Sequence, residues 1–397
     1  MEYQTFLLSK VGQIVSGATP KTSDTENFGG DIAWLTPADL SGYTDKYISH
    51  GARNITQKGY DSCSTQLMPA GTVLFSSRAP IDYVAIARNP ICTNQGFKSI
   101  IPNPDVDSEF LYYQLKYLKK QIQDMGSGTT FREISAKTLG KVRIALPPLE
   151  EQRRIVARIE ELFSELDNGV ETLRKTKQQL AVYRQAVLKD AFSGNWQYHK
   201  ADELCDFITK GTTPKKNEQF KTGEIPFIKV YNLTFDTSLD FTIEPTYVSE
   251  ETHRGFLARS IVYPGDVLLN IVGPPIGKVS IVPDTYKEWN INQAIARFRC
   301  KDSLFNKYLA YFLGFAPTVE KMKSQAKATA GQLNLTLEIC RNIEIPLPEI
   351  DRQKIIVSEI ESRLSVCDSI EKTVDTALQQ AEAMRQSILK QAFEGKI

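Results

Sequence analysis

The second half of this 397-residue chain repeats the first, and the repeat restricts the fold more than any other feature of the sequence. Residues 182–194 read VYRQAVLKDAFSG and residues 383–395 read AMRQSILKQAFEG, an offset of 201 residues. The match continues without a gap back to residues 146 and 347, and about 19 of 50 aligned positions are identical. Solenoid repeats have periods of only ~20–50 residues, so a period of about 200 indicates duplicated domains.

The matched segments, residues 146–195 and 346–397, each predict one long helix. Apolar residues recur about every 3.5 residues between Ile155 and Val187 and between Ile356 and Ile388, including Tyr183, Ile370 and Met384. Each segment begins after proline with acidic residues and ends at glycine, which are helix start and stop signals. Two apolar seams of equal length predict that the helices pair with each other, antiparallel.

The parts that precede these helices, residues 1–145 and 196–345, match each other more loosely. Both mix short apolar runs typical of strands with one amphipathic helix and polar turns. The sequence therefore predicts a mixed α+β chain: two tandem α/β domains (1–145 and 196–345) joined by two long antiparallel coiled-coil helices (146–195 and 346–397) with pseudo-two-fold symmetry.

Composition excludes several classes of protein. Hydrophobic residues make up 41% and charged residues 24% of the chain, as in ordinary globular proteins, and a net charge of +1 does not by itself indicate nucleic-acid binding. No apolar run approaches the ~18 residues of a membrane span, and the first residues do not resemble a signal peptide. Six scattered cysteines without a Cys-x-x-Cys pair fit reduced thiols. We expect a cytoplasmic protein without membrane contact.

No motif predicts catalysis by the chain alone. Residues 273–279 read GPPIGKV, one residue shorter than a phosphate-binding P-loop and with valine where magnesium needs a hydroxyl. His50, His199 and His253 are too few and too separated for a zinc site or a catalytic triad. The Pro-Pro pairs lack the Asx and aromatic neighbours of an adenine methyltransferase motif. We therefore expect no catalytic residue, bound metal or cofactor in this chain.

Several motifs resemble those of one family over the whole chain. They are LPPLEEQRRIV at 146–156, LPEIDRQKIIV at 347–357, LKDAFSG at 188–194, LKQAFEG at 389–395 and NQGFK at 94–98. On these residues the chain resembles the specificity subunit of type I restriction–modification enzymes. The resemblance implies that each α/β domain is a target recognition domain, which reads one half of a bipartite, asymmetric site in double-stranded DNA.

The resemblance also implies partners. The helices would set the spacing between the half-sites and dock two modification subunits, which methylate adenine, and restriction (motor-nuclease) subunits would complete the assembly. S-adenosylmethionine, ATP and magnesium would belong to those partners. Two alternatives stay open: a self-sufficient DNA methyltransferase or nuclease, and a degenerate coiled-coil scaffold without DNA readout.

Polar loops at matching positions supply the candidate DNA contacts. GATPK at 17–21 and GTTPK at 211–215 offer amides, hydroxyls and lysines suited to phosphate, Arg78 could pair with guanine, and Asn270 with adenine. Ordinary turns and capped strand ends are the alternative interpretation of these loops. The candidates are Gly17, Thr19, Lys21, Thr36, Ser76, Arg78, Thr129, Thr130 and Arg132, and Gly211, Thr212, Thr213, Lys215, Lys216, Lys229, Tyr231, Asn232, Asn270, Gln332 and Asn334.

Overall fold

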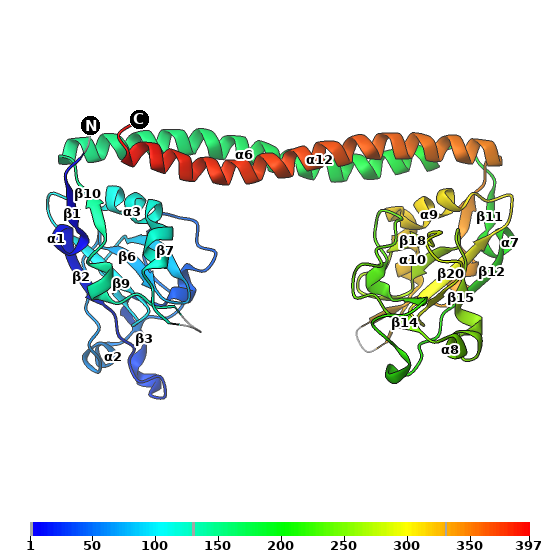
Figure 1. Cartoon of the computed structure of the whole chain (residues 1–397), viewed down its shortest axis with the longest axis horizontal. Helices are drawn as coiled ribbons and strands as arrows, with labels where there is room; N and C mark the ends of the chain where they lie inside the picture. The colour runs from blue at the N-terminus through cyan, green and yellow to red at the C-terminus, as the bar shows by residue number, and fades with distance from the viewer. Residues whose placement is uncertain (1–2, 129–131, 330–331) are drawn as a thin grey trace. The chain divides into compact units, whose positions relative to one another are not determined.

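The computed structural model describes residues 3–128, 132–329 and 332–397, which form two compact units (Figure 1). The first unit comprises Met1–Leu173 with Thr376–Ile397, and the second comprises Arg174–Asp375. Each unit therefore contains one α/β domain and a segment of each long helix. The predicted α+β class is confirmed, whereas the exact domain boundaries at 145, 195 and 345 stay a prediction.

A five-stranded sheet forms the centre of the first unit. Its strand order is β2 (Gly12–Ser16), β9 (Lys98–Pro102), β6 (Val73–Ser77), β7 (Ile81–Ala87) and β5 (Tyr47–Ile48). A parallel pair, β4 (Trp34–Leu35) with β8 (Cys92–Thr93), lies beside it, and β1 (Thr5–Leu7) pairs with β10 (Arg143–Ala145). The other elements are α1 (Leu8–Val11), η1 (Thr25–Asn27), β3 (Phe28–Ile32), η2 (Pro37–Leu40), α2 (Gln57–Asp61), α3 (Ser108–Tyr117), α4 (Lys119–Asp124) and α5 (Ala136–Leu139).

The second unit repeats this plan. Its main sheet has the order β12 (Cys205–Lys210), β20 (Ile295–Cys300), β16 (Val267–Asn270) and β18 (Val279–Ile281). A second sheet contains β14 (Tyr247–Val248), β13 (Ile225–Ile228), β19 (Trp289–Ile291) and β15 (Ile261–Val262), and a third contains β17 (Val272–Gly273), β22 (Gln332–Asn334) and β21 (Lys327–Thr329). The remaining elements are β11 (Tyr198–Lys200) paired with β23 (Glu344–Pro346), α7 (Ala201–Leu204), η3 (Lys216–Glu218), η4 (Val230–Asn232), α8 (Glu250–Arg254), η5 (Ala258–Ser260), α9 (Asn306–Gly314), α10 (Ala316–Gln325) and α11 (Leu337–Arg341).

The main sheet of each unit is buried on both faces. Side chains alternate along a strand, so Val73 and Phe75 of β6 belong to the core beneath α3, whereas Leu74 between them belongs to a separate core that includes Leu35 of β4. In the second unit Val267 and Leu268 divide in the same way. The cores that contain Leu74 and Leu268 include no residue of the long helices.

The predicted long helices are α6 (Leu149–Phe192) and α12 (Ile350–Phe393), each of 44 residues. Ion pairs show their antiparallel order within the second unit: Lys177 pairs with Asp375 (2.7 Å), Arg184 with Asp368 (2.7 Å) and Arg363 with Asp190 (3.1 Å). The order is the same in the first unit, where Arg385 pairs with Asp167 and the start of α6, at Ile155, shares a core with the end of α12, at Phe393. The predicted antiparallel pairing is confirmed within each unit.

Several residues assigned to the apolar seam are instead exposed. Among them, Tyr183, Ile370 and Met384 are 48%, 40% and 52% exposed, whereas Ile159 and Ile360 are buried. A straight α-helix has 3.6 residues per turn and drifts by ~20° per heptad from a 3.5-residue repeat. The strict repeat therefore assigned these residues to the wrong face.

A buried glutamine fastens the start of each long helix to its domain. Gln152 accepts a hydrogen bond from the amide of Asp107 (2.8 Å) and donates to the carbonyls of Asp105 and Pro147 (both 2.9 Å). Gln353 makes the equivalent bonds with Phe305 (2.8 Å), Ser303 (2.9 Å) and Pro348 (2.8 Å). Both glutamines are fully buried. Because each satisfies three backbone groups, the domain is held to the helix at a fixed register.

An aromatic residue fastens the end of the other helix in each unit. In the first unit Phe393 of α12 packs against Phe110 and Tyr117, with ring centroids 5.4 and 5.5 Å apart. In the second unit Phe192 of α6 packs against Tyr308 and Phe312 at 5.3 and 5.2 Å. In the first unit α6 begins at the domain and α12 ends on it. In the second unit α12 begins at the domain and α6 ends on it.

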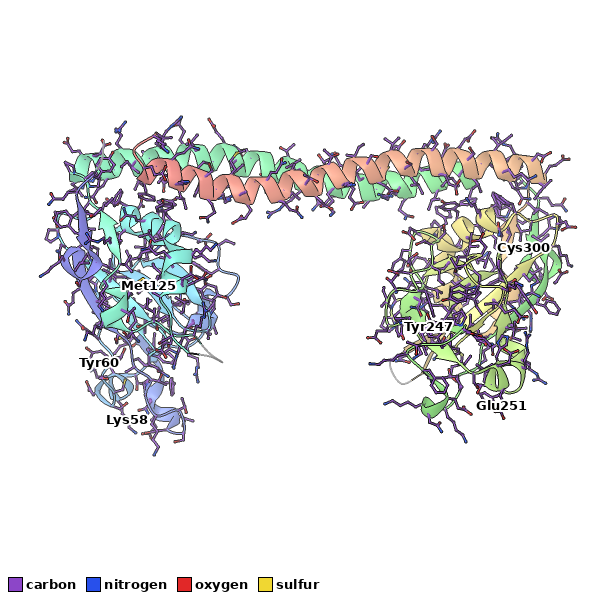
Figure 2. The ribbon with its side chains drawn as sticks, in the orientation of Figure 1. Lys58, Tyr60, Met125, Tyr247, Glu251 and Cys300 are labelled. Atoms are coloured by element: carbon purple, nitrogen blue, oxygen red, sulfur yellow. The ribbon has the colours of Figure 1, made fainter. Side chains whose placement is uncertain are left out.

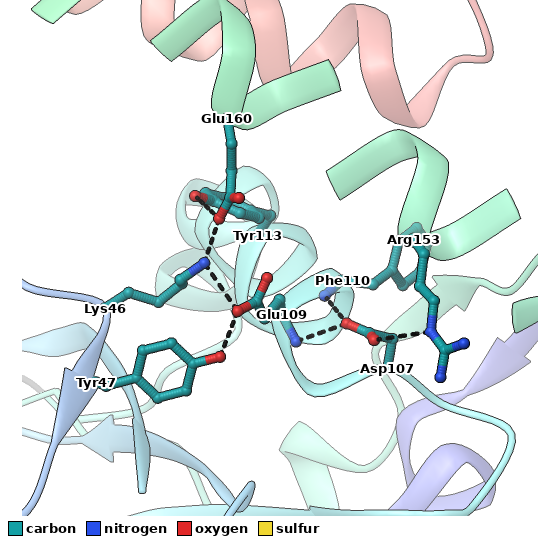
Figure 3. Close-up of polar contacts among 8 residues, drawn as sticks. All are labelled: Lys46, Tyr47, Asp107, Glu109, Phe110, Tyr113, Arg153 and Glu160. Atoms are coloured by element: carbon teal, nitrogen blue, oxygen red, sulfur yellow. Dashed lines mark hydrogen bonds and ion pairs between the residues drawn. The ribbon is translucent and has the colours of Figure 1, made fainter. Parts of the chain in front are cut away.

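A polar cluster adds a further connection in the first unit (Figure 3). Lys46 lies between Glu109 of α3, at 3.0 Å, and Glu160 of α6. Tyr47 donates a hydrogen bond to Glu109, and Tyr113 donates one to Glu160 (3.4 Å). Burial alone would raise the pKa of Glu109, but the hydrogen bonds from Tyr47 and Lys46 outweigh it and lower that pKa. The second unit has a simpler ion pair, Lys307 with Glu361 (2.7 Å).

Candidate nucleic-acid interface

The first predicted loop of the first unit packs against the NQGFK turn. A Cβ at Gly17 would lie only 2.1 Å from the carbonyl oxygen of Asn94 and 2.2 Å from that of Thr93, so only glycine fits there. The amide of Ala18 donates to Thr93 (3.0 Å), and the hydroxyl of Thr19 donates to the side chain of Gln95. Two motifs that are distant in sequence thus form one loop pair.

The second unit builds the same loop pair. A Cβ at Gly211 would lie 2.1 Å from the carbonyl oxygen of Ile291 and 2.3 Å from that of Asn292. The amide of Thr212 donates to Ile291 (3.3 Å), and the hydroxyl oxygen of Thr213 accepts from the amide of Gln293 (3.4 Å). The repeated motifs at 17–21 and 94–95 are therefore two parts of one structure, and both halves of the chain contain it.

A short 3₁₀ turn, η2 or η4, lies next to each loop pair. The residue before η2 in the first unit is Thr36, whose amide and hydroxyl donate to Asp39 at 2.7 and 2.8 Å. In the second unit Lys229 takes this place: its amide donates to Asn232 (2.9 Å), and its ammonium lies 5.9 Å from the ring centre of Tyr231. The same backbone turn thus presents a hydroxyl in one unit and a cation in the other.

The end of the central strand joins the loop pair to a second loop, which carries the candidate Arg132 in the first unit and Asn334 in the second. In the first unit the amide of Ser77 donates to Gly96 (2.7 Å), and the amide of Ile134 donates to Ser77 (3.0 Å). In the second unit Ile271 makes the same bonds with Ala294 (2.8 Å) and Leu335 (2.9 Å). Each unit therefore gathers its candidate loops into one continuous group, which we call the loop cluster.

The structure corrects three candidate contacts. Ser76 and Asn270 are fully buried and Asn232 is 1% exposed, so these side chains face the protein interior. Asn270 donates to Pro275 (2.6 Å) and accepts from the amides of Gly277 (3.0 Å) and Lys278 (2.8 Å). Similarly, Ser76 bonds to Pro80 (2.7 Å), and Asn232 donates to Asp240 (3.0 Å) and Ile243 (2.8 Å). They shape the loops, and we do not retain them as DNA contacts.

The other described candidates lie at or near the surface, apart from Gly211, which is buried by its close approach to the turn. The exposed candidates are Lys21, Arg132, Thr213, Lys215, Lys216 and Gln332. The half-buried candidates are Gly17, Thr19, Thr36, Arg78, Thr212, Lys229, Tyr231 and Asn334. Thr129 and Thr130 lie outside the described residues. Contact of each of these residues with DNA stays a prediction.

Two charged residues of the loop cluster were not among the candidates. Lys98 is only 9% exposed and donates to the carbonyls of Gln95 (3.1 Å) and Phe97 (3.3 Å). Glu133 lies 3.6 Å from Arg78 and 3.9 Å from Lys98. Burial lowers the pKa of Lys98, and the charge of Glu133 partly opposes that effect. A lysine directly after the NQGF turn was the one sequence signal that could have identified this group.

Lys58 of α2 projects at the end of the first unit that lies away from its long-helix segments (Figure 2), and it pairs with Asp24 (3.0 Å) and Glu26 (2.5 Å). Within the described residues, His, Cys, Asp and Glu do not form a group of three or more that could hold a metal ion. In the same residues, no helix is both long and apolar enough to span a membrane.

Comparison with known families decides what the chain is related to. The model of the type I restriction modification DNA specificity domain matches residues 1–180 and again residues 193–380. The chain belongs to this family. The match to both halves also confirms the family resemblance that the sequence motifs indicate.

Type I specificity subunits from both archaea and bacteria are similar to the chain. The MjaIX specificity subunit of Methanocaldococcus jannaschii is 37% identical over 249 residues, which is 57% of this chain and 57% of that protein. The EcoBI specificity subunit of Escherichia coli is 26% identical over 98% of this chain and 85% of its own length. The first match thus spans little more than half of that relative.

Solved structures of the family share the fold. A chain from a structure describing complex assembly and conformational transition of the type I R-M system has a TM-score of 0.78 at 21% identity, with 100% of this chain and 98% of that chain covered. The HsdS subunit from Thermoanaerobacter tengcongensis has a TM-score of 0.61 at 20% identity and covers 100% of this chain and 97% of its own. Both chains therefore share the fold of this chain over its whole length.

Proposed function

We propose that the chain is the DNA-specificity subunit of a type I restriction–modification complex. Each loop cluster would read one half of a bipartite, asymmetric site in double-stranded DNA. The observation that carries this proposal is the recurrence of one loop framework in both units with different side chains upon it. Thr36 in the first cluster corresponds to Lys229 in the second. Equal frameworks with unequal surfaces suit the recognition of two unequal sequences.

The long helices would set the spacing of the half-sites and dock the partners. A helix of 44 residues measures ~66 Å at 1.5 Å per residue, and a continuous helix is a stiff spacer. Val182, Val366 and Met384 leave apolar surface exposed on these helices, at 71%, 58% and 52%. We propose that two modification subunits dock on these helices.

The chemistry would belong to those partners. The modification subunits would bind S-adenosylmethionine and methylate adenine, and restriction subunits would add the ATP- and magnesium-dependent motor and nuclease. In this assembly the present chain is a cytoplasmic, non-catalytic subunit. Its own residues select the DNA and hold it in position.

Exchange of one α/β domain tests the modular reading of DNA. Residues 1–145 are replaced by the equivalent domain of a relative, and methylated adenines are mapped in DNA from cells that express the chimaera with its modification partner. We expect one half of the methylated motif to change and the other to persist. A change in both halves would contradict the proposal. Methyl transfer by the purified chain alone would favour a self-sufficient methyltransferase, and failure to bind the mapped duplex would favour a scaffold.

Replacing Lys215 and Lys216 together by alanine is expected to weaken binding to all duplexes by a similar factor. Both lysines are exposed on the loop that follows Gly211. Each phosphate contact contributes about 0.9 to the slope of log affinity against log salt, so the slope should fall by about 1 to 2. Fluorescence anisotropy over a salt series measures it. Lys301→Ala with Lys354→Ala, beside the start of α12, is the charge-matched control, and an equal loss of slope in that control would remove the assignment.

A further inference from the structure

Three charged side chains meet in the loop cluster of the first unit. Arg78 follows β6, Lys98 begins β9, and Glu133 belongs to the second loop, whose backbone pairs with that of Arg78. The carboxylate of Glu133 faces both cations, at 3.6 Å from Arg78 and 3.9 Å from Lys98. One carboxylate thus serves two cations, and the group keeps an excess of one positive charge.

The two cations differ in their freedom to move. Lys98 is 9% exposed and its ammonium is bonded to two backbone carbonyls of the turn beneath it. Arg78 has a side chain that is 38% exposed, and 3.6 Å from Glu133 is beyond hydrogen-bond length. An ion pair between two partly exposed side chains at that distance is weaker than a bidentate contact of arginine with the edge of guanine. Arg78 can therefore leave Glu133, whereas Lys98 stays beside it.

The second unit has the same backbone at these positions but no charges. Val272 pairs with Asn334 as Arg78 pairs with Glu133. The amide of Phe97 donates to the carbonyl of Asn94, and the amide of Ile295 donates to that of Asn292, both at 3.2 Å. Phe97 and Ile295 are therefore equivalent. The residues that follow them, Lys98 and Ala296, are equivalent too. The charged group is therefore not needed to build the loop cluster, and its presence in one unit alone points to a role in recognition.

We infer that Glu133 is a specificity-determining residue, which holds Arg78 away from DNA until a guanine in the first half-site takes it. This inference rests on the proposed function and deepens it. On a matching half-site Arg78 exchanges the carboxylate for the O6 and N7 acceptors of guanine, and Lys98 keeps Glu133 paired. On other sequences Arg78 gains no bidentate partner and remains with Glu133, so it adds little affinity for the phosphate backbone.

The test compares binding of wild-type and Glu133→Gln chains, each in complex with the modification subunit. One duplex carries the mapped site and another has its first half scrambled. Glutamine keeps the size of the side chain but frees Arg78 to contact phosphate. At ~0.15 M salt one additional phosphate contact raises affinity roughly fivefold and steepens the salt slope by about 0.9. We expect both changes on the scrambled duplex and a smaller gain on the mapped site.

Two further variants show whether Glu133 acts through Arg78. In an Arg78→Ala background, Glu133→Gln should leave affinity for the scrambled duplex unchanged. An equal gain in that background would show simple repulsion of DNA by the carboxylate and overturn the inference. Glu320→Gln on α10, where Glu320 pairs with Lys323 (2.9 Å), changes the net charge equally and should have no effect.

The outcomes also separate this inference from the proposed function. If the wild-type complex does not distinguish the two duplexes, the proposed function fails. If it distinguishes them and Glu133→Gln behaves as wild type, only the role of Glu133 fails. Arg78→Lys keeps one positive charge without the forked donors, so it should lose affinity for the mapped site alone; equal losses on both duplexes would reject guanine as the partner of Arg78.

Discussion

Replacing Gln353 by methionine is expected to destabilise the second unit by about 3–5 kcal/mol, because three buried backbone groups lose their partner. Methionine has nearly the same length and volume but can neither accept from the amide of Phe305 nor donate to the carbonyls of Ser303 and Pro348. Urea denaturation of the full chain measures the loss. Hydrogen exchange at the amide of Phe305 localises it, since that amide should lose its protection.

An exposed glutamine of the same helix provides the matched control. Gln386 lies on the surface of α12, so Gln386→Met should change stability by less than about 0.5 kcal/mol. Gln152→Met should repeat the large effect in the first unit, where Gln152 makes the same three bonds. Equal stability of the Gln353 and Gln386 variants would show that these bonds do not hold the domain to its helix.

The fastening residues show which part of the fold the sequence could reveal. Gln152 and Gln353, like Phe192 and Phe393, fall in the ungapped register of the repeat, and the helices that carry them lie within the predicted segments. The sequence does not identify the groups that these residues contact. Gln353 bonds to the backbone of Phe305, whose counterpart in the other half is Asp107. Because the bond is to the backbone, the two partner residues need not be of the same type, and a comparison of the two halves cannot find them.

The candidate site was predictable as loops but not as a group. Gly17 and the Asn94 turn were each visible as repeated motifs, and the structure alone shows that they pack together. Polar residues at strand ends were less informative. Asn270 has the sequence pattern of an exposed recognition residue, yet its amide caps the turn at 275–278. Whether such a side chain turns outward or inward depends on tertiary contacts, which a one-dimensional pattern does not contain.

The role of Lys98 and Glu133 could not be predicted from the sequence for a related reason. Glu133 stands 55 residues after Arg78 in the chain, and only the pairing of their backbones brings the charges together. The comparison between the two halves is also needed to interpret them. Without the matching backbone pairings of the second unit, the charged group would resemble an ordinary surface ion pair.

Replacing Gly211 by alanine is expected to abolish recognition of the second half-site while the first is still read. The added Cβ would lie 2.1 Å from the carbonyl oxygen of Ile291 and 2.3 Å from that of Asn292, and backbone atoms cannot yield as a flexible side chain can. The loop must therefore leave the turn, and the lysines that follow it lose their position. Overpacking of this kind costs about 1–3 kcal/mol in local stability.

The measurement is the ratio of two affinities, one for the mapped duplex and one for a duplex with its second half scrambled. This ratio should approach unity in Gly211→Ala and stay at the wild-type value in Gly17→Ala. The reverse should hold when the first half is scrambled, because Gly17 approaches Asn94 and Thr93 as closely. Gly169→Ala is the control: no atom lies within 4 Å of its Cβ, and alanine within a helix should stabilise α6 by about 1 kcal/mol. Retained discrimination by Gly211→Ala would place DNA recognition outside the loop cluster, whereas loss of both half-sites from one glycine would mean that the two clusters do not act independently.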